Sequence, residues 1–249
     1  MLMPHSEIVL TFDVDWAPDF ILNHVAGFLI ERNVKSTWFI THPSPAVERL
    51  RQYPHLFELG IHPNFKPAST HGNDPQEVID YCLSLVPNAK SVRTHSLFQS
   101  SPILDLLIGS TSCSHDVSLF LPRTPCLRPV EYIRGGKKLI RIPYVWEDDF
   151  EMDHPAPFWH IGQLLTIGDG LKVLNFHPIH IYLNSETLDN YTSLLRHDIK
   201  YGELTESIAE PFVHHGTGTK TMFLEVLDYL QDIQRDAYFI SELDYRGMP

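Results

Sequence analysis

The residues of this chain best suited to chemistry are acids, histidines and an arginine that directly follow short apolar segments. They stand in five places: Asp13-Val14-Asp15, His62, Arg93-Thr94-His95, Asp148-Asp149 and His177. A carboxylate can accept a proton, and histidine can donate or accept one near neutral pH. Both groups also bind divalent metal ions. The combination is typical of metal-assisted hydrolysis.

The segments in front of these residues are predicted to be strands that alternate with helices. The predicted strands are residues 8–12, 36–41, 56–62, 91–94, 110–114, 138–144, 172–176 and 238–241. The predicted helices are residues 19–33, 46–53, 74–85 and 221–235. This alternation predicts an α/β fold, a distorted β/α barrel of about seven parallel strands, formed as a single domain by residues 1–249. The loops that follow the strands of such a barrel gather on one face, so the polar residues should share one pocket.

Composition excludes several classes of function. The formal charge of −12 makes nucleic acid an unexpected partner, because phosphate binding needs a basic surface. Three unpaired cysteines argue against a disulfide framework and against a cysteine zinc site. No apolar run approaches the ~20 residues of a membrane helix. The first residues lack the pattern of a signal peptide, so we expect a cytoplasmic protein.

Four short motifs resemble those of the polysaccharide deacetylase family, carbohydrate esterase family 4. They are TFDVDWAPD, ELGIHPN, SVRTHS and LNFHP, which occur in the family's order between residues 11 and 178. By this resemblance Asp13 is the general base, and Asp15 and His62 are metal ligands. His177 is the general acid, and Arg93 orients the base.

The resemblance also implies that Asp148 or Asp149 orients His177. The sequence departs from the family in its second motif, which is His-x-x-x-His, because Lys66 stands where the second histidine belongs. An ammonium group has no lone pair for a metal. His71 or His95 should therefore supply the third ligand, and His71 is preferred because it lies in a loop that can adjust to the ion.

These residues predict a metal-dependent hydrolase that removes an acetyl or formyl group from the nitrogen of a sugar, in surface polysaccharide or lipopolysaccharide assembly. One divalent ion is expected, zinc first, with cobalt, nickel or iron as alternatives. The substrate would be a glycan or a smaller sugar compound. Two other functions stay open: hydrolysis of a small non-sugar amide, and carbohydrate binding without catalysis. Metal binding separates the last of these from the enzymes.

Overall fold

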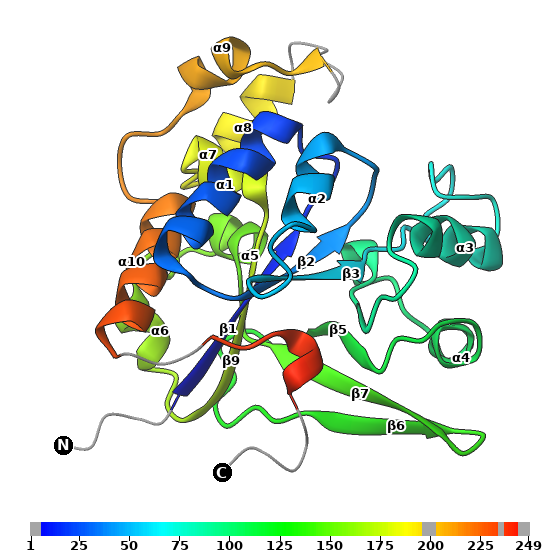
Figure 1. The fold of residues 1–249 in the computed structure, drawn as a ribbon. Coiled ribbons are helices and arrows are strands. Elements are labelled where there is room, and N and C mark those ends of the chain that lie inside the picture. The colour runs from blue at the N-terminus through cyan, green and yellow to red at the C-terminus, as the bar shows by residue number, and fades with distance from the viewer. Residues whose placement is uncertain (1–5, 196–202, 234–236, 244–249) are drawn as a thin grey trace.

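A nine-stranded sheet runs through the molecule, with helices packed around it (Figure 1). The computed structural model describes residues 6–195, 203–233 and 237–243. The strands are β1 (Ser6–Asp13), β2 (Ser36–Ile40), β3 (Phe57–Ile61), β4 (Ser91–Val92), β5 (His115–Phe120), β6 (Val130–Arg134), β7 (Lys137–Tyr144), β8 (Trp146–Glu147) and β9 (Gly170–Phe176). The larger helices are α1 (Asp19–Arg32), α3 (Pro75–Leu85), α4 (Ser101–Ser110), α8 (Leu188–Leu195) and α10 (Thr219–Asp232). Shorter ones are α2 (Pro45–Leu50), α5 (Asp148–Asp153), α6 (Ile161–Leu165), α7 (Pro178–Leu183) and α9 (Glu206–Ala209), with 3₁₀ turns η1 (His95–Leu97), η3 (Glu210–Phe212) and η4 (Ile240–Glu242).

The strand order is β6-β7-β5-β4-β3-β2-β1-β9-β8. Neighbouring strands are parallel except β6 and β7, which form an antiparallel hairpin. Only Val145 separates β7 from β8, and its N–H donates to the carbonyl of Val173 in β9 at 3.0 Å. The continuous segment formed by β7, Val145 and β8 therefore contacts both β5 and β9, which are far apart in the strand order. The sheet must curve back on itself to allow this. With β7 and β8 taken as one interrupted strand, the described residues contain seven parallel strands. The predicted α/β fold is confirmed.

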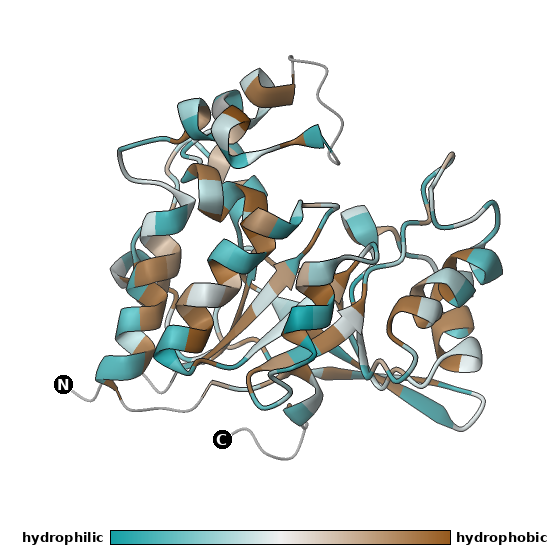
Figure 2. Cartoon of the chain, turned by 45° about the horizontal axis from the view of Figure 1, so that its top comes forward, coloured by the Kyte–Doolittle hydropathy of each residue, from teal (hydrophilic) through white to brown (hydrophobic). Residues whose placement is uncertain are grey.

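Alternate residues of the strands serve two apolar cores, as the twofold period of a strand requires. In β1, Leu10 and Phe12 join the larger core beneath the helices, whereas Val9 joins a smaller one. Figure 2 shows the brown, apolar sides of several helices turned toward the sheet. The smaller core lies inside the curled sheet and includes Ile240 from η4. The N–H of Ile240 donates to the Thr37 hydroxyl at the start of β2, so η4 closes the end of the sheet where the strands begin.

Two predicted strands are wrong. Residues 110–114 were predicted as a strand, but α4 reaches Ser110 and β5 begins at His115. The Ser100 hydroxyl accepts the N–H of Ile103 and caps α4, a helix that the sequence analysis missed. Residues 238–241 contain the turn η4 instead of a strand, because Ile240 plugs the smaller core.

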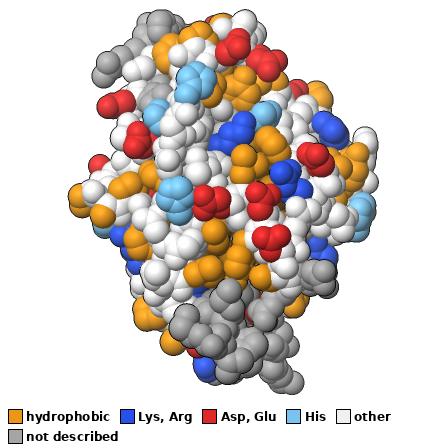
Figure 3. Space-filling view, turned by 90° about the vertical axis from the view of Figure 1, so that its left-hand side faces the viewer, with side chains coloured by type: hydrophobic (Ala, Val, Ile, Leu, Met, Phe, Trp, Pro, Cys, Tyr) orange, Lys and Arg blue, Asp and Glu red, His pale blue; other side chains and the backbone are white. Residues whose placement is uncertain are grey.

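The remaining predicted strands and helices occur in the structure with ends that differ by a few residues, and residues 234–235 of the predicted helix 221–235 lie outside the described part. Asp74 caps α3 by accepting N–H groups from Gln76 and Glu77, and Pro75 occupies the first turn as the sequence indicates. Between α7 and α10 the chain forms α8, α9 and η3, and residues 196–202 there lie outside the described part. Among the described residues no helix has the length and apolar character needed to cross a membrane. Acidic, basic and apolar side chains are interspersed on the face shown in Figure 3.

Candidate active site and metal centre

Five of the predicted site residues lie at the carboxyl ends of parallel strands. Asp13 is the last residue of β1, and His62 directly follows β3. Arg93 directly follows β4, Asp148 follows β8 and His177 follows β9. The curl of the sheet brings these strand ends to one edge, as expected for a β/α barrel.

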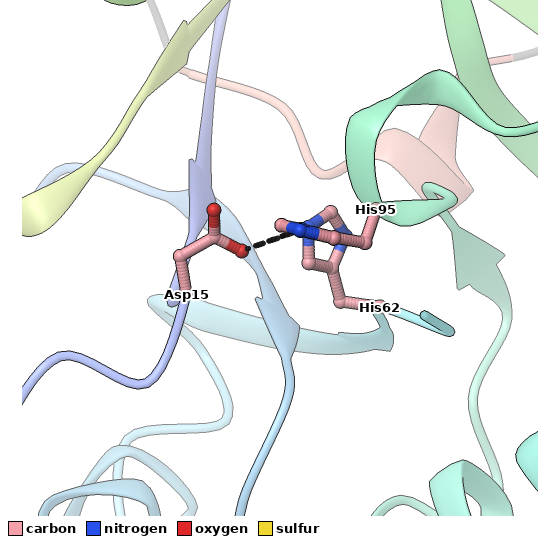
Figure 4. A group of neighbouring side chains, drawn as sticks. All are labelled: Asp15, His62 and His95. Carbon is pink, nitrogen blue, oxygen red and sulfur yellow. Dashed lines mark hydrogen bonds and ion pairs between the residues drawn. The ribbon is translucent and has the colours of Figure 1, made fainter. Parts of the chain in front are cut away.

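Asp15, His62 and His95 form a compact group at this edge (Figure 4). Asp15 Oδ1 lies 3.1 Å from His62 Nε2 and 3.1 Å from His95 Nδ1, and the two ring nitrogens are 3.4 Å apart. The other nitrogen of His62, Nδ1, donates to the carbonyl of Arg93 at 2.7 Å. In the neutral ring, this bond leaves the Nε2 lone pair directed into the group. Burial opposes charging of the ring, but Asp13 and Asp15 raise the pKa of His62, so a cation would have to displace a proton here.

The three side chains suit a divalent ion. They offer two imidazole nitrogens and one carboxylate oxygen, all within 4.8 Å of one another. A protein carbonyl that accepts the second N–H of a histidine ligand is the usual support of a metal site. Three such ligands with open positions are typical of catalytic zinc. The donor set therefore fits the expected metal.

A strained turn presents the Asp15 carboxylate. Asp15 and Trp16 both adopt left-handed backbone conformations, with φ of 41° and 58°. Such conformations are uncommon for residues other than glycine and persist where neighbouring structure holds them. Here the N–H of Trp16 donates to the Thr41 hydroxyl at 3.1 Å. The Trp16 ring also meets the edge of His95 at 5.3 Å between centroids.

The structure places His95, and not the preferred His71, in the compact group with Asp15 and His62, and the choice of third ligand stays a prediction. His71 is buried beside the group, where its ring stacks on Tyr81 and its Nδ1 accepts the N–H of Asn64 at 3.2 Å. Burial lowers the pKa of His71 to about 4, with a further contribution from His62. The η1 turn places His95 in the group instead. His71 packs beside the group, and its buried Nε2 has no hydrogen-bond partner among the described residues.

Asp13 is held by an arginine inside the curled sheet. The guanidinium of Arg93 is fully buried between the rings of Phe39 and Tyr144, at 4.7 and 4.6 Å from their centroids. Its Nη1 donates to Asp13 Oδ1 at 3.0 Å. Burial opposes ionisation of Asp13, but Arg93 together with nearby histidines outweighs it and lowers the pKa of this carboxyl. Asp13 is therefore ionised and able to accept a proton.

His177 directly follows β9, the parallel neighbour of β1, and so lies beside Asp13. Its Nδ1 donates to Asp148 Oδ1 at 2.7 Å, and its backbone N–H donates to Asp148 Oδ2 at 2.7 Å. Asp149 is farther from Nδ1, at 4.0 Å, and pairs with His180 at 3.1 Å. Burial disfavours the charged ring, yet Asp149 and Asp148 raise the pKa of His177 well above its ordinary value. The free Nε2 lies 3.9 Å from Asp13 Oδ2.

Two polar residues in the site had no role in the sequence analysis. Asn175 Nδ2 donates to Asp13 Oδ2 at 2.9 Å and to Glu147 Oε1 at 3.0 Å. Burial raises the pKa of Glu147 to about 7. A signal for Asn175 was present, because it continues the inward-facing positions of Leu171 and Val173 as a polar residue in an otherwise apolar strand.

Most of the chain matches a known protein family. Residues 10–195 match the model of the WbmS-like polysaccharide deacetylase family. A solved structure from Bordetella bronchiseptica, a polysaccharide deacetylase involved in O-antigen biosynthesis, shares 35% sequence identity with a TM-score of 0.75, over 89% of this chain and 90% of that one. The chain therefore belongs to the WbmS-like polysaccharide deacetylase family. No curated protein matches it.

More distant structures are also similar. A family 4 acetyl xylan esterase from Clostridium thermocellum, in complex with cobalt, shares 12% identity with a TM-score of 0.49, over 94% of this chain and 88% of that one. A carbohydrate esterase domain of a multidomain xylanase, from the hindgut metagenome of Trinervitermes trinervoides, has the same identity and TM-score over 96% and 89%.

Proposed function

We propose that this protein is a metal-dependent N-deacylase that hydrolyses an acetamido or formamido group on a sugar. One observation carries the proposal: a base and an acid flank the group Asp15–His62–His95. His62 Nε2 lies 3.8 Å from Asp13 Oδ2, and His177 Nε2 lies 3.7 Å from Asp15 Oδ2. Amide hydrolysis needs both groups, because water must lose a proton and the departing amine must gain one.

Asp15, His62 and His95 would hold the divalent ion, with zinc as the first choice for this donor set. When bound, such an ion polarises the amide carbonyl and lowers the pKa of water. The chain itself then has to position the substrate carbonyl between Asp13 and His177. The rigid strand ends that carry these residues suit this task, because small errors of position are costly to rate.

Asp13 is assigned the role of general base. The Arg93 guanidinium keeps it ionised and fixes one carboxylate oxygen, Oδ1, by a hydrogen bond. The other oxygen, Oδ2, faces His62 and His177 across the site. Asp13 can therefore take a proton from water at this point without changing its rotamer.

His177 is assigned the role of general acid. Asp148 holds its ring through Nδ1, so that Nε2 is directed toward the reaction space. Because its pKa is raised, the protonated ring is favoured, and it can give the Nε2 proton to the amine. Burial around His177 and Asp148 excludes bulk water from this transfer.

A sugar substrate is supported by family membership and by the relative from Bordetella bronchiseptica, whose role is in O-antigen biosynthesis. We therefore place the reaction in the assembly of a surface polysaccharide. Hydrolysis of a small non-sugar amide has no comparable support from the family match, and carbohydrate binding without catalysis leaves the acid and base of the site without a role.

The test is release of acetate or formate from N-acetyl and N-formyl sugars, supplied free, nucleotide-linked and as oligosaccharides. We expect release that a chelator abolishes and zinc restores, with Asp13→Asn as the inactive control. Metal-loaded protein that binds oligosaccharides and releases no acid from any of them would overturn the proposal in favour of a binding module.

A further inference from the structure

Glu147 is a carboxyl group of the site that the reaction above does not use. It lies on β8 between Trp146, which is buried in the larger core, and Asp148. Its Oε1 accepts two hydrogen bonds, from the Tyr144 hydroxyl at 3.1 Å and from Asn175 Nδ2 at 3.0 Å. A glutamate in this surrounding has to be explained, because burying a carboxyl group is costly unless its hydrogen bonds are satisfied.

The carboxamide of Asn175 links Glu147 to the base. Its two N–H groups donate to different carboxylates, one to Glu147 Oε1 and the other to Asp13 Oδ2. Its oxygen accepts a hydrogen bond from Arg93. All three polar directions of the amide are therefore fixed, and a flipped amide would place its oxygen against two carboxylates. Asn175 itself is fully buried, so no water is available to replace these bonds.

We propose that Glu147 is a positioning residue that aligns the base Asp13 through the Asn175 carboxamide. This inference rests on the proposed function. Arg93 fixes Oδ1 of Asp13 and Asn175 fixes Oδ2, so the plane of the carboxylate is set from both sides. Without Glu147, one N–H of Asn175 loses its acceptor, and the amide is free to turn away from Asp13.

A second metal ion is the competing explanation, because Asp13, Glu147 and His177 also offer ligand atoms within 4.8 Å of one another. The hydrogen bonds argue against it. Both oxygens of Asp13 already accept bonds from Arg93 and Asn175, and a cation would compete with the Arg93 charge at the same carboxylate. The positioning role requires only the hydrogen bonds that the structure shows.

A double-mutant cycle tests the inference in the full, metal-loaded chain. Glu147→Ala and Asn175→Ala should each lower kcat, by about 10-fold or more, with little change in KM or in bound metal. The double variant should be hardly worse than Asn175→Ala alone, because residues that act through one another are not additive. Glu147→Gln retains an acceptor for Asn175 and Tyr144, so it should rescue most of the loss. Glu48→Ala, an exposed carboxylate on α2, is the matched control.

A second readout does not depend on activity. The side-chain NH₂ signals of Asn175 in a ¹H–¹⁵N spectrum, assigned by their loss in Asn175→Ala, should exchange slowly with water in the native protein and in Glu147→Gln, and faster in Glu147→Ala. Unchanged exchange in Glu147→Ala, multiplicative losses of kcat, or two metal ions per chain would each overturn the inference. A native protein that deacylates nothing but shows this exchange pattern would refute the proposed function and leave the contact between Glu147 and Asn175 intact.

Discussion

His62 and His177 are held in the same way, through Nδ1, but are proposed to have different roles, as metal ligand and as general acid. Each donates from Nδ1 to an oxygen and turns Nε2 into the site, but His62 donates to the neutral carbonyl of Arg93 and His177 donates to the Asp148 carboxylate. A carbonyl partner leaves the ring free to be a neutral metal ligand, whereas a carboxylate partner favours the charged ring. The pKa values of both rings are raised, but only His177 has a carboxylate on Nδ1, which suits it to the proposed role of acid.

Replacing Asp148 should show most clearly how the partner of Nδ1 controls His177. In Asp148→Asn the ring loses its charged partner, so the pKa of His177 falls from its raised value. The acid then loses its proton at lower pH, and the alkaline limb of the pH–kcat profile should move to lower pH. Asp149→Asn should also move that limb, because Asp149 contributes to the raised pKa, but only Asp148→Asn should lower the maximal kcat by releasing the ring. Identical maximal rates in both variants would contradict the orienting role of Asp148.

Asp13 and Asp15 can be separated by the same kind of experiment. Asp13→Asn should keep the metal and lose kcat by ~10²–10⁴-fold, the usual contribution of a positioned base. Asp15→Asn should lose the metal, because Asp15 lies against both histidines of the group. Metal analysis beside the rate measurement checks both expectations. If Asp13→Asn loses the metal and Asp15→Asn retains it, the two roles are exchanged.

At the scale of elements, the close packing of β3 can be tested by adding a single methyl group. A Cβ at Gly60 would lie 2.6 Å from Ser91 Oγ and 2.8 Å from the Phe39 ring, whose face contacts Arg93. Gly60→Ala should therefore lower the free energy of unfolding by about 1–3 kcal/mol, the usual cost of overpacking. Gly27→Ala in α1 is the control, since nothing lies within 4 Å of the added methyl and alanine favours a helix. Equal urea midpoints for both variants would contradict the packing of β3.

The strand ends of the site were predictable from sequence, and the short elements beside them were not. Apolar runs ending in Asp13, His62 and His177 indicated both the strands and the edge at which they meet. The helices α5 and α7 that start at Asp148 and Pro178 span six residues each, too few for a helical period to show. The choice between His71 and His95 could not be made from sequence either, because the position of His95 depends on the η1 turn and that of His71 on a packed loop.

At the scale of the whole molecule, the site concentrates buried charge in an acidic protein. The most informative group is Glu147, whose pKa is raised by burial from an ordinary 4.5 to about 7. Its neutral form is favoured in the folded protein. The stability that this preference contributes is complete at pH values below the pKa of Glu147 in the unfolded chain. It is lost as the pH rises through the pKa of Glu147 in the folded protein.

Glu147→Gln should remove this dependence, because glutamine does not ionise. In metal-free protein, the free energy of unfolding of the variant relative to the native chain should rise as the pH increases through the interval between 4.5 and about 7. Urea unfolding at a series of pH values, with a chelator present, measures the difference. A difference that stays constant with pH would show that Glu147 does not carry the raised pKa.

Metal analysis of three proteins tests the central claim most directly: the native chain, His95→Ala and His71→Ala, each purified without chelator and reloaded with zinc. The site described here predicts about one ion per chain in the native protein and in His71→Ala, as a single mononuclear site requires, and a strong loss in His95→Ala. Full occupancy in His95→Ala, or loss in His71→Ala alone, would contradict the group Asp15–His62–His95 as the metal centre.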